Sequence, residues 1–396
     1  MKFFYCKNCL MPSTRPRLTF NKEGICNGCQ WAEAKKIKVD WQARWKELEE
    51  LCDKYRDTGG SNWDCIVPCS FGKDSYHISW NMKHKLKMNP LLVYISPLMP
   101  SEVGRKNQAN LIEQGFDTVQ IHLNGQVYRK LCKKGFIEQG RPQLAFVTGL
   151  TTVILRVAMA FNIQLVMYGE EGESEYGGRM NFADKAKVDR KWTVETYFSG
   201  RDTSEYIGSE FSQADLKWWH FPSQKELDKS GLYLTHWSYF EDWNHLVHRE
   251  TALSIGFNRA VDLKSIEDGV TNIATFTDYT SLDDPLMRTL HTYLMFLKFG
   301  YGRGTQEASN DIKVGVMTRD EGIEMAKRYD TYDCSDFLDK ILDLYEMAEE
   351  EYCQVIDKWA NKAILEKVDG RWQLKKEIHF GLDINNSIEI DYDGSY

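Results

Sequence analysis

The chain has 396 residues, of which 42% are hydrophobic and 13% aromatic, and its formal net charge is -8 with an isoelectric point near 5.7. This length predicts two or three domains, and this apolar content excludes a disordered chain. The acidic balance argues against a surface that attracts nucleic acid or anionic membrane. The sequence has no signal-peptide pattern and no apolar run of membrane-spanning length, so we expect a cytoplasmic protein without membrane insertion.

Four of the ten cysteines form two close pairs near the start of the chain. Cys6 and Cys9, like Cys26 and Cys29, are separated by two residues, and 16 residues lie between the two pairs. This is the spacing of a four-thiolate zinc ribbon, in which short turns let the sulfurs converge on one ion. We expect residues 1–40 to be such a ribbon with a structural Zn²⁺. Accidental pairs or a redox-active pair are the alternatives.

Apolar residues at three- and four-residue spacing predict an amphipathic helix over residues 39–56. We assign residues 41–60 to a connecting helix that ends at a boundary formed by Gly59, Gly60 and Ser61, because paired glycines end helices and mark linkers.

Beyond this boundary, short apolar strands alternate with helices, which is the pattern of a parallel sheet with right-handed crossovers. The expected fold class is α/β, with a parallel-sheet domain at residues 61–200 and a mainly helical substrate or partner domain at residues 201–396. The predicted strands span residues 64–68, 91–95, 118–123 and 164–168, and the predicted helices span 76–88, 104–114, 126–133 and 143–161.

The segment Ser70-Phe71-Gly72-Lys73-Asp74-Ser75 joins the first of these strands to the first helix. Backbone N–H groups of such a loop and of the first helical turn point to one place, where the helix dipole favours an anion. Lys73 adds a positive charge there, and Ser70 and Ser75 add hydroxyl donors. A Walker loop would have Lys followed directly by Ser or Thr, whereas here Asp74 follows. The segment therefore predicts a phosphate loop of another kind, with an ordinary strand-to-helix turn as the alternative.

The loop resembles the PP-loop of ATP pyrophosphatases, usually S-G-G-x-D-S, whose members cleave ATP between the α and β phosphates. The match carries over Ser70, Gly72, Asp74 and Ser75, and it implies ATP and Mg²⁺ as cofactors. Phe71 stands where the pattern has glycine, and a side chain there restricts positive φ and close approach of the backbone to a phosphate.

Two further loops follow predicted strands and should face the PP-loop, because nucleotides bind at the carboxyl ends of parallel strands. Ser96 follows the second strand and is a candidate contact for ribose or adenine, unless Ser-Pro only starts a turn. The loop of residues 169–178 carries four carboxylates, which either stay solvated or hold Mg²⁺ or substrate. Its candidates for Mg²⁺ or substrate are Glu170, Glu171, Glu175 and Tyr176.

The sequence changes character after about residue 200. Aromatic residues crowd the region from Trp218 to Trp243, as core packing or as a face for sugar rings. Asp283 and Asp284 precede Pro285 in a helix-cap pattern, and they are further candidates for Mg²⁺ or substrate. Residues 298–304 predict a flexible loop that presents Arg303, and Arg319 opens a helix behind a capping box at Thr318.

Taken in order, these motifs resemble the N-acetyl sugar amidotransferases of bacterial surface-glycan biosynthesis, which include the WbpG lipopolysaccharide proteins and the PseA pseudaminic acid proteins. The motifs that carry the resemblance span nearly the whole chain. They are the run from Cys6 to Pro16, the Cys26–Cys29 pair, the loop ending in Glu175-Tyr176-Gly177-Gly178, the Asp283-Asp284 pair and the block from Lys298 to Arg303.

The resemblance implies that the N-acetyl group of a sugar acid becomes an acetamidino group. ATP would adenylate the amide oxygen, and ammonia would replace AMP. Lys73 and Asp74 would act on the triphosphate, with Mg²⁺ held through Asp74 or Glu170, and Arg303 or Arg319 would clamp the sugar carboxylate. Ammonia would come from a separate glutaminase (HisH-like) and a channel subunit (HisF-like), similar to those of histidine biosynthesis.

Two alternatives stay open. A tRNA-modifying PP-loop enzyme of the thiolation type would share both motifs, and it would need reactive thiols such as Cys69 or Cys132 and a basic cleft. An inactive PP-loop scaffold, in which Phe71 has abolished ATP binding, is the second alternative.

Overall fold

The structure is a computed structural model that describes residues 1–57, 62–198, 200–201, 203–208, 210–260, 274–392 and 394. The predicted boundary at Gly59, Gly60 and Ser61 lies outside the described residues. Within them, no helix is both long enough and apolar enough to cross a membrane.

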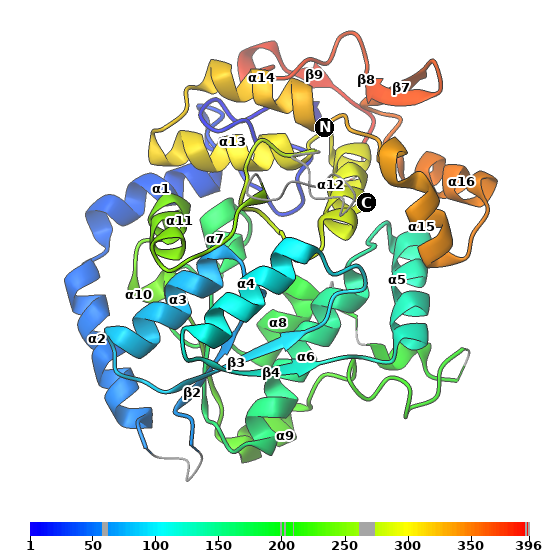
Figure 1. The fold of residues 1–396 in the computed structure, drawn as a ribbon. Coiled ribbons are helices and arrows are strands. Elements are labelled where there is room, and N and C mark those ends of the chain that lie inside the picture. Colours follow the sequence, from blue (N-terminus) through cyan, green and yellow to red (C-terminus); the bar gives the residue numbers. More distant parts are fainter. Residues whose placement is uncertain are drawn as a thin grey trace.

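Five parallel strands form the central sheet in the order β4-β3-β2-β5-β6 (Figure 1). The predicted α/β fold class and its parallel sheet are confirmed, and the four predicted strands match within three residues at each end. The fifth strand, β6, was not among the predictions, and the sheet therefore continues past residue 200. The strands are β2 (Cys65–Pro68), β3 (Pro90–Ile95), β4 (Asp117–Ile121), β5 (Leu165–Tyr168) and β6 (Tyr233–His236).

The central strands are buried on both faces, because alternate residues of a strand point to opposite sides. In β3, Leu91 and Val93 pack into one core together with Ile154 of a following helix. Leu92 and Tyr94 pack into the other core. The sheet thus separates two apolar cores. The helices that cover its two faces within this part of the chain are α3 (Lys73–His84), α4 (Glu102–Glu113), α5 (Gly125–Gln139) and α6 (Leu144–Ala160).

The connections leave the centre of the sheet in opposite directions. From β2 the chain passes through α3 to β3 and β4, and it then returns to β5 on the other side of β2. Adjacent β2 and β5 therefore send their following loops apart, which opens a crevice at the carboxyl ends of these strands. The PP-loop follows β2, and the acidic loop of residues 169–178 follows β5.

The region after β5 winds around the sheet before it supplies β6 and two helices beside α3. His236 of β6 is followed at once by a short helix, and Asn244 caps the next helix by accepting from Leu246 N at 3.0 Å. The helices of this region are α7 (Gly172–Tyr176), α8 (Arg190–Tyr197), α9 (Gln224–Ser230), α10 (Trp237–Phe240) and α11 (His245–Ser254).

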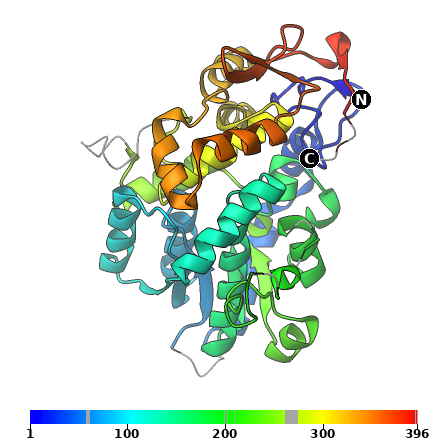
Figure 2. The same cartoon turned by 90° about the vertical axis from the view of Figure 1, so that its right-hand side faces the viewer.

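The C-terminal region is mainly helical and lies above the carboxyl ends of the strands (Figures 1 and 2). Asp284 caps α12 by accepting from Met287 N at 3.1 Å, with Pro285 in the first turn, as the sequence predicts. Thr318 and Glu321 form the predicted capping box of α14. The elements are α12 (Pro285–Phe299), α13 (Arg303–Val314), α14 (Arg319–Tyr329), α15 (Leu338–Tyr345), α16 (Glu349–Trp359), and the hairpin of β7 (Leu365–Val368) and β8 (Arg371–Leu374).

The prediction of a flexible loop over residues 298–304 is wrong. Only Gly300, Tyr301 and Gly302 separate α12 from α13, and Arg303 is the first residue of a helix. The first of these glycines has φ 76°, a left-handed conformation that ends α12. Arg303 is therefore held on a rigid element.

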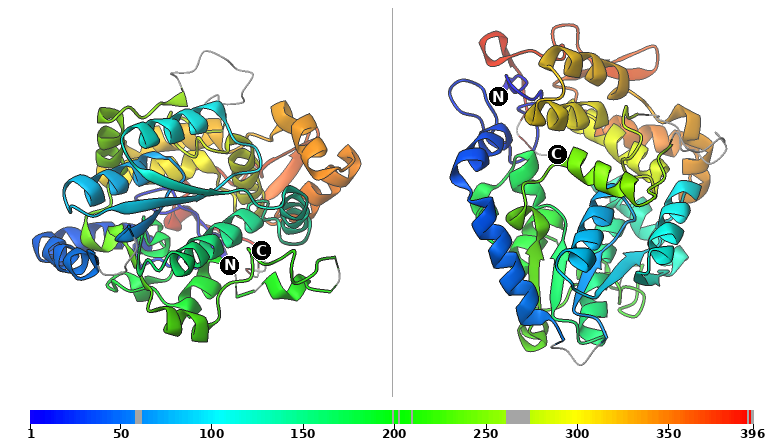
Figure 3. Two further views of the ribbon diagram at one scale, coloured as in Figure 1. Left: turned by 60° about the horizontal axis from the view of Figure 1, so that its bottom comes forward. Right: turned by 60° about the vertical axis from the view of Figure 1, so that its left-hand side comes forward.

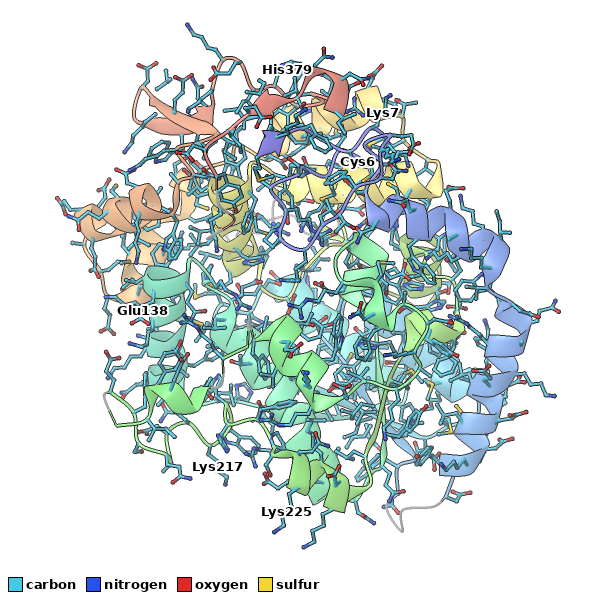
Figure 4. All side chains as sticks on the ribbon, turned by 180° about the vertical axis from the view of Figure 1, so that it is seen from behind. Cys6, Lys7, Glu138, Lys217, Lys225 and His379 are labelled. Atoms are coloured by element: carbon cyan, nitrogen blue, oxygen red, sulfur yellow. The ribbon has the colours of Figure 1, made fainter. Side chains whose placement is uncertain are left out.

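The N-terminal segment pairs with the C-terminal end of the chain and continues into two helices. Strand β1 (Lys2–Phe3) pairs antiparallel with β9 (Ile388–Glu389), so the first and last strands meet. Helix α1 (Asn27–Lys38) leads from the cysteine-rich segment, and α2 (Trp41–Tyr55) follows along the edge of the molecule (Figure 3). Seen from behind, Cys6 lies near His379 at the end of the molecule opposite Lys217 and Lys225 (Figure 4).

Candidate active site

A cavity of about 600 Å³ opens above the carboxyl ends of β2 and β5. Ser70, Gly72, Lys73 and Asp74 of the PP-loop line one side of it. The opposite side comes from the C-terminal region and the N-terminal segment. Its lining residues there include Arg15, Lys35, Tyr279, Asp283, Asp284, Arg303 and Glu307. The PP-loop, the N-terminal segment and the C-terminal region, which are far apart in the sequence, therefore line one cavity.

The PP-loop forms a helix N-terminus aimed at this cavity. Gly72 is the N-cap of α3 and no side chain caps it, so first-turn N–H groups are left for a ligand. Ser75 Oγ donates to Gly72 O at 3.0 Å and fixes the turn from within. Lys73 lies at the cavity wall with its ammonium 5.3 Å from the ring centre of Tyr279.

Phe71 adopts the conformation that the glycine of the PP-loop pattern would supply. Its φ is 57°, in the left-handed region, where an L-residue is strained by about 1–2 kcal/mol. The ring is 3% exposed and packs edge-on against Tyr94, with 5.1 Å between ring centres. The side chain lies outside the cavity lining. Phe71 thus keeps the loop's shape, and its ring does not fill the phosphate cradle.

Asp74 has two partners at the start of α3. Lys73 Nζ lies 2.7 Å from its Oδ2, and His248 Nδ1 lies 2.8 Å from its Oδ1. Burial favours the protonated form of Asp74, but the Lys73 charge and the His248 hydrogen bond outweigh burial and hold its pKa well below the usual range. Asp74 is therefore an anion with one oxygen tied to each neighbour.

The acidic loop after β5 is largely neutralised by the N-terminal segment. Arg17 forms a two-pronged ion pair with Glu173, at 2.6 and 2.8 Å, and Lys35 lies 2.8 Å from Glu175. Glu171 is the N-cap of α7 and accepts from Ser174 N at 2.8 Å. Glu171, Glu173 and Glu175 therefore have structural partners within the protein.

Glu170 differs from its three neighbours in the loop. It accepts a hydrogen bond from Tyr176 OH at 3.0 Å and lines the cavity. Burial raises its pKa, and the nearby charge of Asp74 raises it further. Asp74 and Glu170 thus form a like-charge pair whose repulsion a Mg²⁺ ion between them would relieve. This donor set fits the implied Mg²⁺.

The four predicted zinc ligands converge. The sulfurs of Cys6, Cys9, Cys26 and Cys29 lie within 4.8 Å of one another, and all four residues are buried. Cys9 Sγ and Cys26 Sγ are 3.5 Å apart, and Cys6 Sγ and Cys29 Sγ are 4.0 Å apart. These separations bracket the edge of about 3.8 Å of a tetrahedron with Zn–S bonds of about 2.3 Å. The donor set and geometry fit a structural zinc.

Cys6 Sγ also accepts backbone hydrogen bonds from Asn8 N at 3.4 Å and Cys26 N at 3.3 Å, which is how a metal-bound thiolate is held. The ribbon contacts both sides of the cavity. Asn27 Nδ2 donates to Gly178 O at 2.6 Å, and Ser309 of α13 donates to Cys9 O. The cysteine segment therefore joins the acidic loop to the helix that carries Arg303.

Two adjacent carboxylates lie on the far wall of the cavity. Burial raises the pKa of Asp283 to about 6, and burial together with the neighbouring Asp283 raises that of Asp284 to about 8. Asp284 also accepts from Met99 N at 3.3 Å, which ties the start of α12 to the loop after β3. Near neutral pH the pair therefore carries less than its full negative charge.

Arg303 lies at the cavity wall in a polar cluster. Its Nε is 2.9 Å from Glu307 Oε1, and Thr275 and Thr277 donate to the same carboxylate at 2.7–2.9 Å. Arg288 is buried below it, where burial and the Arg303 charge lower its pKa to about 10. The guanidinium of Arg303 is thus positioned by Glu307.

The structure brings most of the residues predicted for ATP, Mg²⁺ and substrate together, and it leaves five of them away from the cavity. Those that line it are Ser70, Gly72, Lys73, Asp74, Glu170, Glu175, Tyr176, Asp283, Asp284 and Arg303. Those outside the lining are Phe71, Ser75, Ser96, Glu171 and Arg319. Ser96 Oγ lies 3.5 Å from the carbonyl oxygen of Pro97, a local contact that fits the alternative of a Ser-Pro turn.

The placement of Arg319 at the substrate is corrected by its contacts. Its Nη2 donates to Gly381 O at 2.9 Å and lies 3.5 Å from Cys6 O, so it braces the cysteine segment against the C-terminal tail. An arginine behind a capping box is indistinguishable in sequence from one that faces a ligand, and only the packing of α14 separates the two.

Several cavity residues were not predicted. Arg15, Lys35 and Tyr279 line the cavity, and the sequence around them carries no phosphate-binding pattern. The buried His248 lies outside the lining and contacts Asp74. The local sequence His248-Arg249-Glu250 gives no indication of this contact. The contact joins residues 174 positions apart, and local patterns do not reveal such a distance.

We predict that Phe71→Ala destabilises the protein by about 3–5 kcal/mol, because it empties the space beside Tyr94. Phe71→Gly should be less destabilised than Phe71→Ala by about 1 kcal/mol, because glycine adopts positive φ without strain. Urea unfolding of the three proteins measures both differences. A glycine variant less stable than the alanine variant would show that the loop is not strained.

We predict that Cys26→Ser removes one equivalent of bound zinc and lowers the melting temperature, because the remaining three thiolates lose the closed tetrahedral site. The matched control is Cys353→Ser, since Cys353 is exposed and lies outside the cluster. Metal analysis and thermal melting check this prediction. Equal zinc contents in the two variants would contradict it.

We predict a pH-dependent gain in stability for Asp284→Asn. The raised pKa means that folded Asp284 binds a proton that the unfolded chain releases between about pH 4 and pH 8, so stability falls as pH rises through this window. Asn removes this fall and keeps a capping oxygen, and we expect a gain of about 1–3 kcal/mol at pH 8 that shrinks towards pH 4. Urea unfolding at both pH values tests it, with exposed Asp228→Asn as control. A gain independent of pH would contradict the titration.

Comparison with known proteins identifies the C-terminal region. Residues 273–379 match the family model described as the C-terminal domain of WbpG-like LPS biosynthesis proteins. Among solved structures, the NMN synthetase of Francisella tularensis is similar at 11% sequence identity, over 79% of this chain and 96% of that chain, with a TM-score of 0.32. The search of curated proteins gave no match. The region that carries Asp283, Asp284 and Arg303 is therefore similar to the C-terminal domain of WbpG-like proteins.

Proposed function

We propose that this protein is an ATP-dependent amidotransferase that converts the N-acetyl group of a sugar acid into an acetamidino group, for bacterial surface-glycan biosynthesis in the cytoplasm. The observation that carries the proposal is the composition of one cavity. A PP-loop with Lys73 and Asp74 faces a wall formed by the WbpG-like C-terminal domain, including Asp283 and Arg303.

The chemistry needs an activated oxygen, because an amide oxygen is a poor leaving group. In the first step the amide oxygen attacks the α phosphorus of ATP, the bond to the β-phosphate oxygen breaks, and pyrophosphate leaves. In the second step ammonia adds to the amide carbon, loses protons to base, and expels AMP. The product is an amidine, and the atoms of ATP are recovered as AMP and pyrophosphate.

The PP-loop residues suit the first step. The free N–H groups at the start of α3 and the Lys73 ammonium stabilise the charge that develops on departing pyrophosphate. Asp74 and Glu170 would hold Mg²⁺, which neutralises the phosphates when it is bound. Because Asp74 keeps its pKa low, it offers a carboxylate throughout the neutral range.

The opposite wall suits the sugar. The Arg303 side chain is 23% exposed, and Glu307 fixes it at the cavity wall, from which it would pair with the sugar carboxylate. The aromatic residues between Trp218 and Trp243 supply few cavity contacts apart from Trp243, since Trp219 and Trp237 are buried in the cores. We therefore assign sugar recognition to α12 and α13 and the loop before them.

Ammonia must come from solution or from a partner. We propose a separate glutaminase (HisH-like) with a channel subunit (HisF-like), as the resemblance implies. Co-purification with such a pair, and glutamine replacing ammonium in the assay only when the pair is present, would support this partnership.

The alternative of a tRNA-thiolating enzyme is disfavoured by the thiols. Burial raises the pKa of Cys69 to about 12, and it raises that of Cys132 as well, so neither is a ready thiolate. The alternative of an inactive scaffold is disfavoured by Phe71, whose ring packs on Tyr94 away from the cavity.

The test is ATP-dependent release of AMP and pyrophosphate with ammonium present, using a panel of N-acetylated sugar acids, RNA, or no acceptor. We expect release only with a sugar acid, and we expect Lys73→Ala to lower the rate by about 10²–10³-fold, because a preorganised charge at the leaving group is lost. The matched control is Lys85→Ala, since Lys85 is exposed at the far end of the same helix.

The outcomes separate the three proposals. Release with RNA alone would move the protein to nucleic-acid modification. Absence of both release and ATP binding would favour the scaffold. Equal losses in Lys73→Ala and Lys85→Ala would mean that the PP-loop is not the reacting site.

A further inference from the structure

Two histidines and a glutamate converge behind the PP-loop, outside the cavity lining. They are His77 in the middle of α3, His248 in α11 and Glu241, which directly follows α10. Helices α3 and α11 pack side by side (Figure 1). One ligand atom from each of the three residues lies within 4.8 Å of the others.

The two imidazole rings stack, with 4.2 Å between ring centres and 25° between ring planes. Both turn the same ring nitrogen towards Glu241. His77 Nε2 lies 2.7 Å from Glu241 Oε2, and His248 Nε2 lies 3.9 Å from the same oxygen. A tetrahedral site with bonds of about 2.0–2.1 Å has ligands about 3.3 Å apart, and the two distances bracket this value.

The other ring nitrogen of each histidine is already engaged. His248 Nδ1 faces the Asp74 carboxylate at 2.8 Å, and a carboxylate only accepts, so Nδ1 carries the proton. The hydroxyl of Thr251 lies 3.0 Å from Val247 O and 2.9 Å from His77 Nδ1, so it engages this ring nitrogen in either tautomer. The Nε2 of neutral His248 therefore presents a lone pair towards Glu241, whereas His77 Nε2 donates a hydrogen bond to Glu241 at 2.7 Å when no ion is bound.

This arrangement leaves an unmet electrostatic requirement. His248 is fully buried, and its Nε2 has no hydrogen-bond partner among the described residues. Glu241 Oε2 already accepts from Trp237 Nε1 at 2.6 Å. The unpartnered His248 nitrogen and the Glu241 carboxylate therefore face one another, and a metal ion bound in place of the His77 proton would satisfy all three ligands.

We propose that His77 Nε2, His248 Nε2 and the Glu241 carboxylate bind a second transition-metal ion, of the Zn²⁺ class. Two imidazoles and one carboxylate are a donor set of borderline softness, which favours Zn²⁺ over Mg²⁺ or Ca²⁺. Glu241 is 25% exposed, so water has access as the remaining ligand.

The surroundings match those of metal-bound histidines, which donate their second N–H to a carboxylate or another oxygen. Asp74, Thr251 and Trp237 take this supporting position for His248, His77 and Glu241 respectively. Because Asp74 is also a PP-loop residue, an ion at this site fixes the ring that orients it. The three ligands are positioning residues for the cavity and do not line it.

The experiment is metal analysis of the full chain, expressed without a histidine tag in medium containing Zn²⁺. We expect two equivalents of zinc per chain, one in the cysteine ribbon and one here. His77→Gln and Glu241→Gln should each keep one equivalent. His84→Gln should keep two, because His84 is an exposed histidine at the end of the same helix.

A cobalt spectrum provides a second readout that does not depend on activity. Co²⁺ in the ribbon gives intense thiolate-to-metal charge-transfer bands, which a site of two nitrogens and one oxygen lacks. We expect the wild-type protein to bind Co²⁺ in two spectrally distinct steps, and Glu241→Gln to lose only the step without charge transfer. The partly exposed Glu241 makes this variant the less disruptive one for folding.

Some results would overturn the proposal. A single equivalent of zinc in the wild-type protein, lost in Cys26→Ser, would mean that His77 Nε2 only donates a hydrogen bond to Glu241. Two equivalents that persist in both His77→Gln and Glu241→Gln would place the second ion elsewhere. Either result would leave the proposed amidotransferase reaction intact, since that reaction is tested by AMP release.

Discussion

The chain extends the sheet from β2 to β4 in one direction and then from β5 to β6 in the other, and the position of the candidate site follows from this change. Parallel strands need crossovers, and crossovers are right-handed, so a chain that extends a sheet first one way and then the other must separate two neighbouring loops. Here the separated loops carry Lys73 and Glu170. The crevice between them exists whatever the later domain does, and the C-terminal helices only close it.

The cysteine-rich segment has a role at this crevice beyond its own stability. Its cations neutralise Glu173 and Glu175, and its backbone is tied to Gly178 and to Ser309. A loop with four carboxylates behind a strand would otherwise repel itself. Glu171, Glu173 and Glu175 have structural partners, which leaves Glu170 as the acid of this loop that interacts with Asp74. Electrostatic pairing by the ribbon thus selects which carboxylate of the loop is free for chemistry.

Asp74 links the PP-loop, which lines the cavity, to His248, which lies outside the cavity lining. One oxygen faces Lys73 at the phosphate loop, and the other faces His248 on the far side of α3. Anything that changes the orientation of the His248 ring therefore changes the position of a PP-loop carboxylate. Because α3 and α11 pack rigidly around these rings, the coupling acts over one hydrogen bond.

Elements with local signals could be predicted from the amino-acid sequence. Apolar runs gave β2, β3, β4 and β5, the cap patterns gave the starts of α12 and α14, and the cysteine spacing gave a cluster that closes within 4.8 Å. The PP-loop was recognisable because its chemistry lies in six consecutive residues. β6 escaped prediction because its four residues, Tyr233 to His236, lie in an aromatic region with no strand periodicity.

Which side chains contact one another depends on how distant segments pack in the folded chain. Arg303 and Arg319 look alike in sequence, yet one lines the cavity and the other braces backbone carbonyls. The positive φ of Phe71 and the contact of Asp74 with His248 depend on packing between segments far apart in the chain. Local patterns fix backbone conformation, whereas the partners of a charged side chain are fixed by burial and distance, which exist only after the chain has folded.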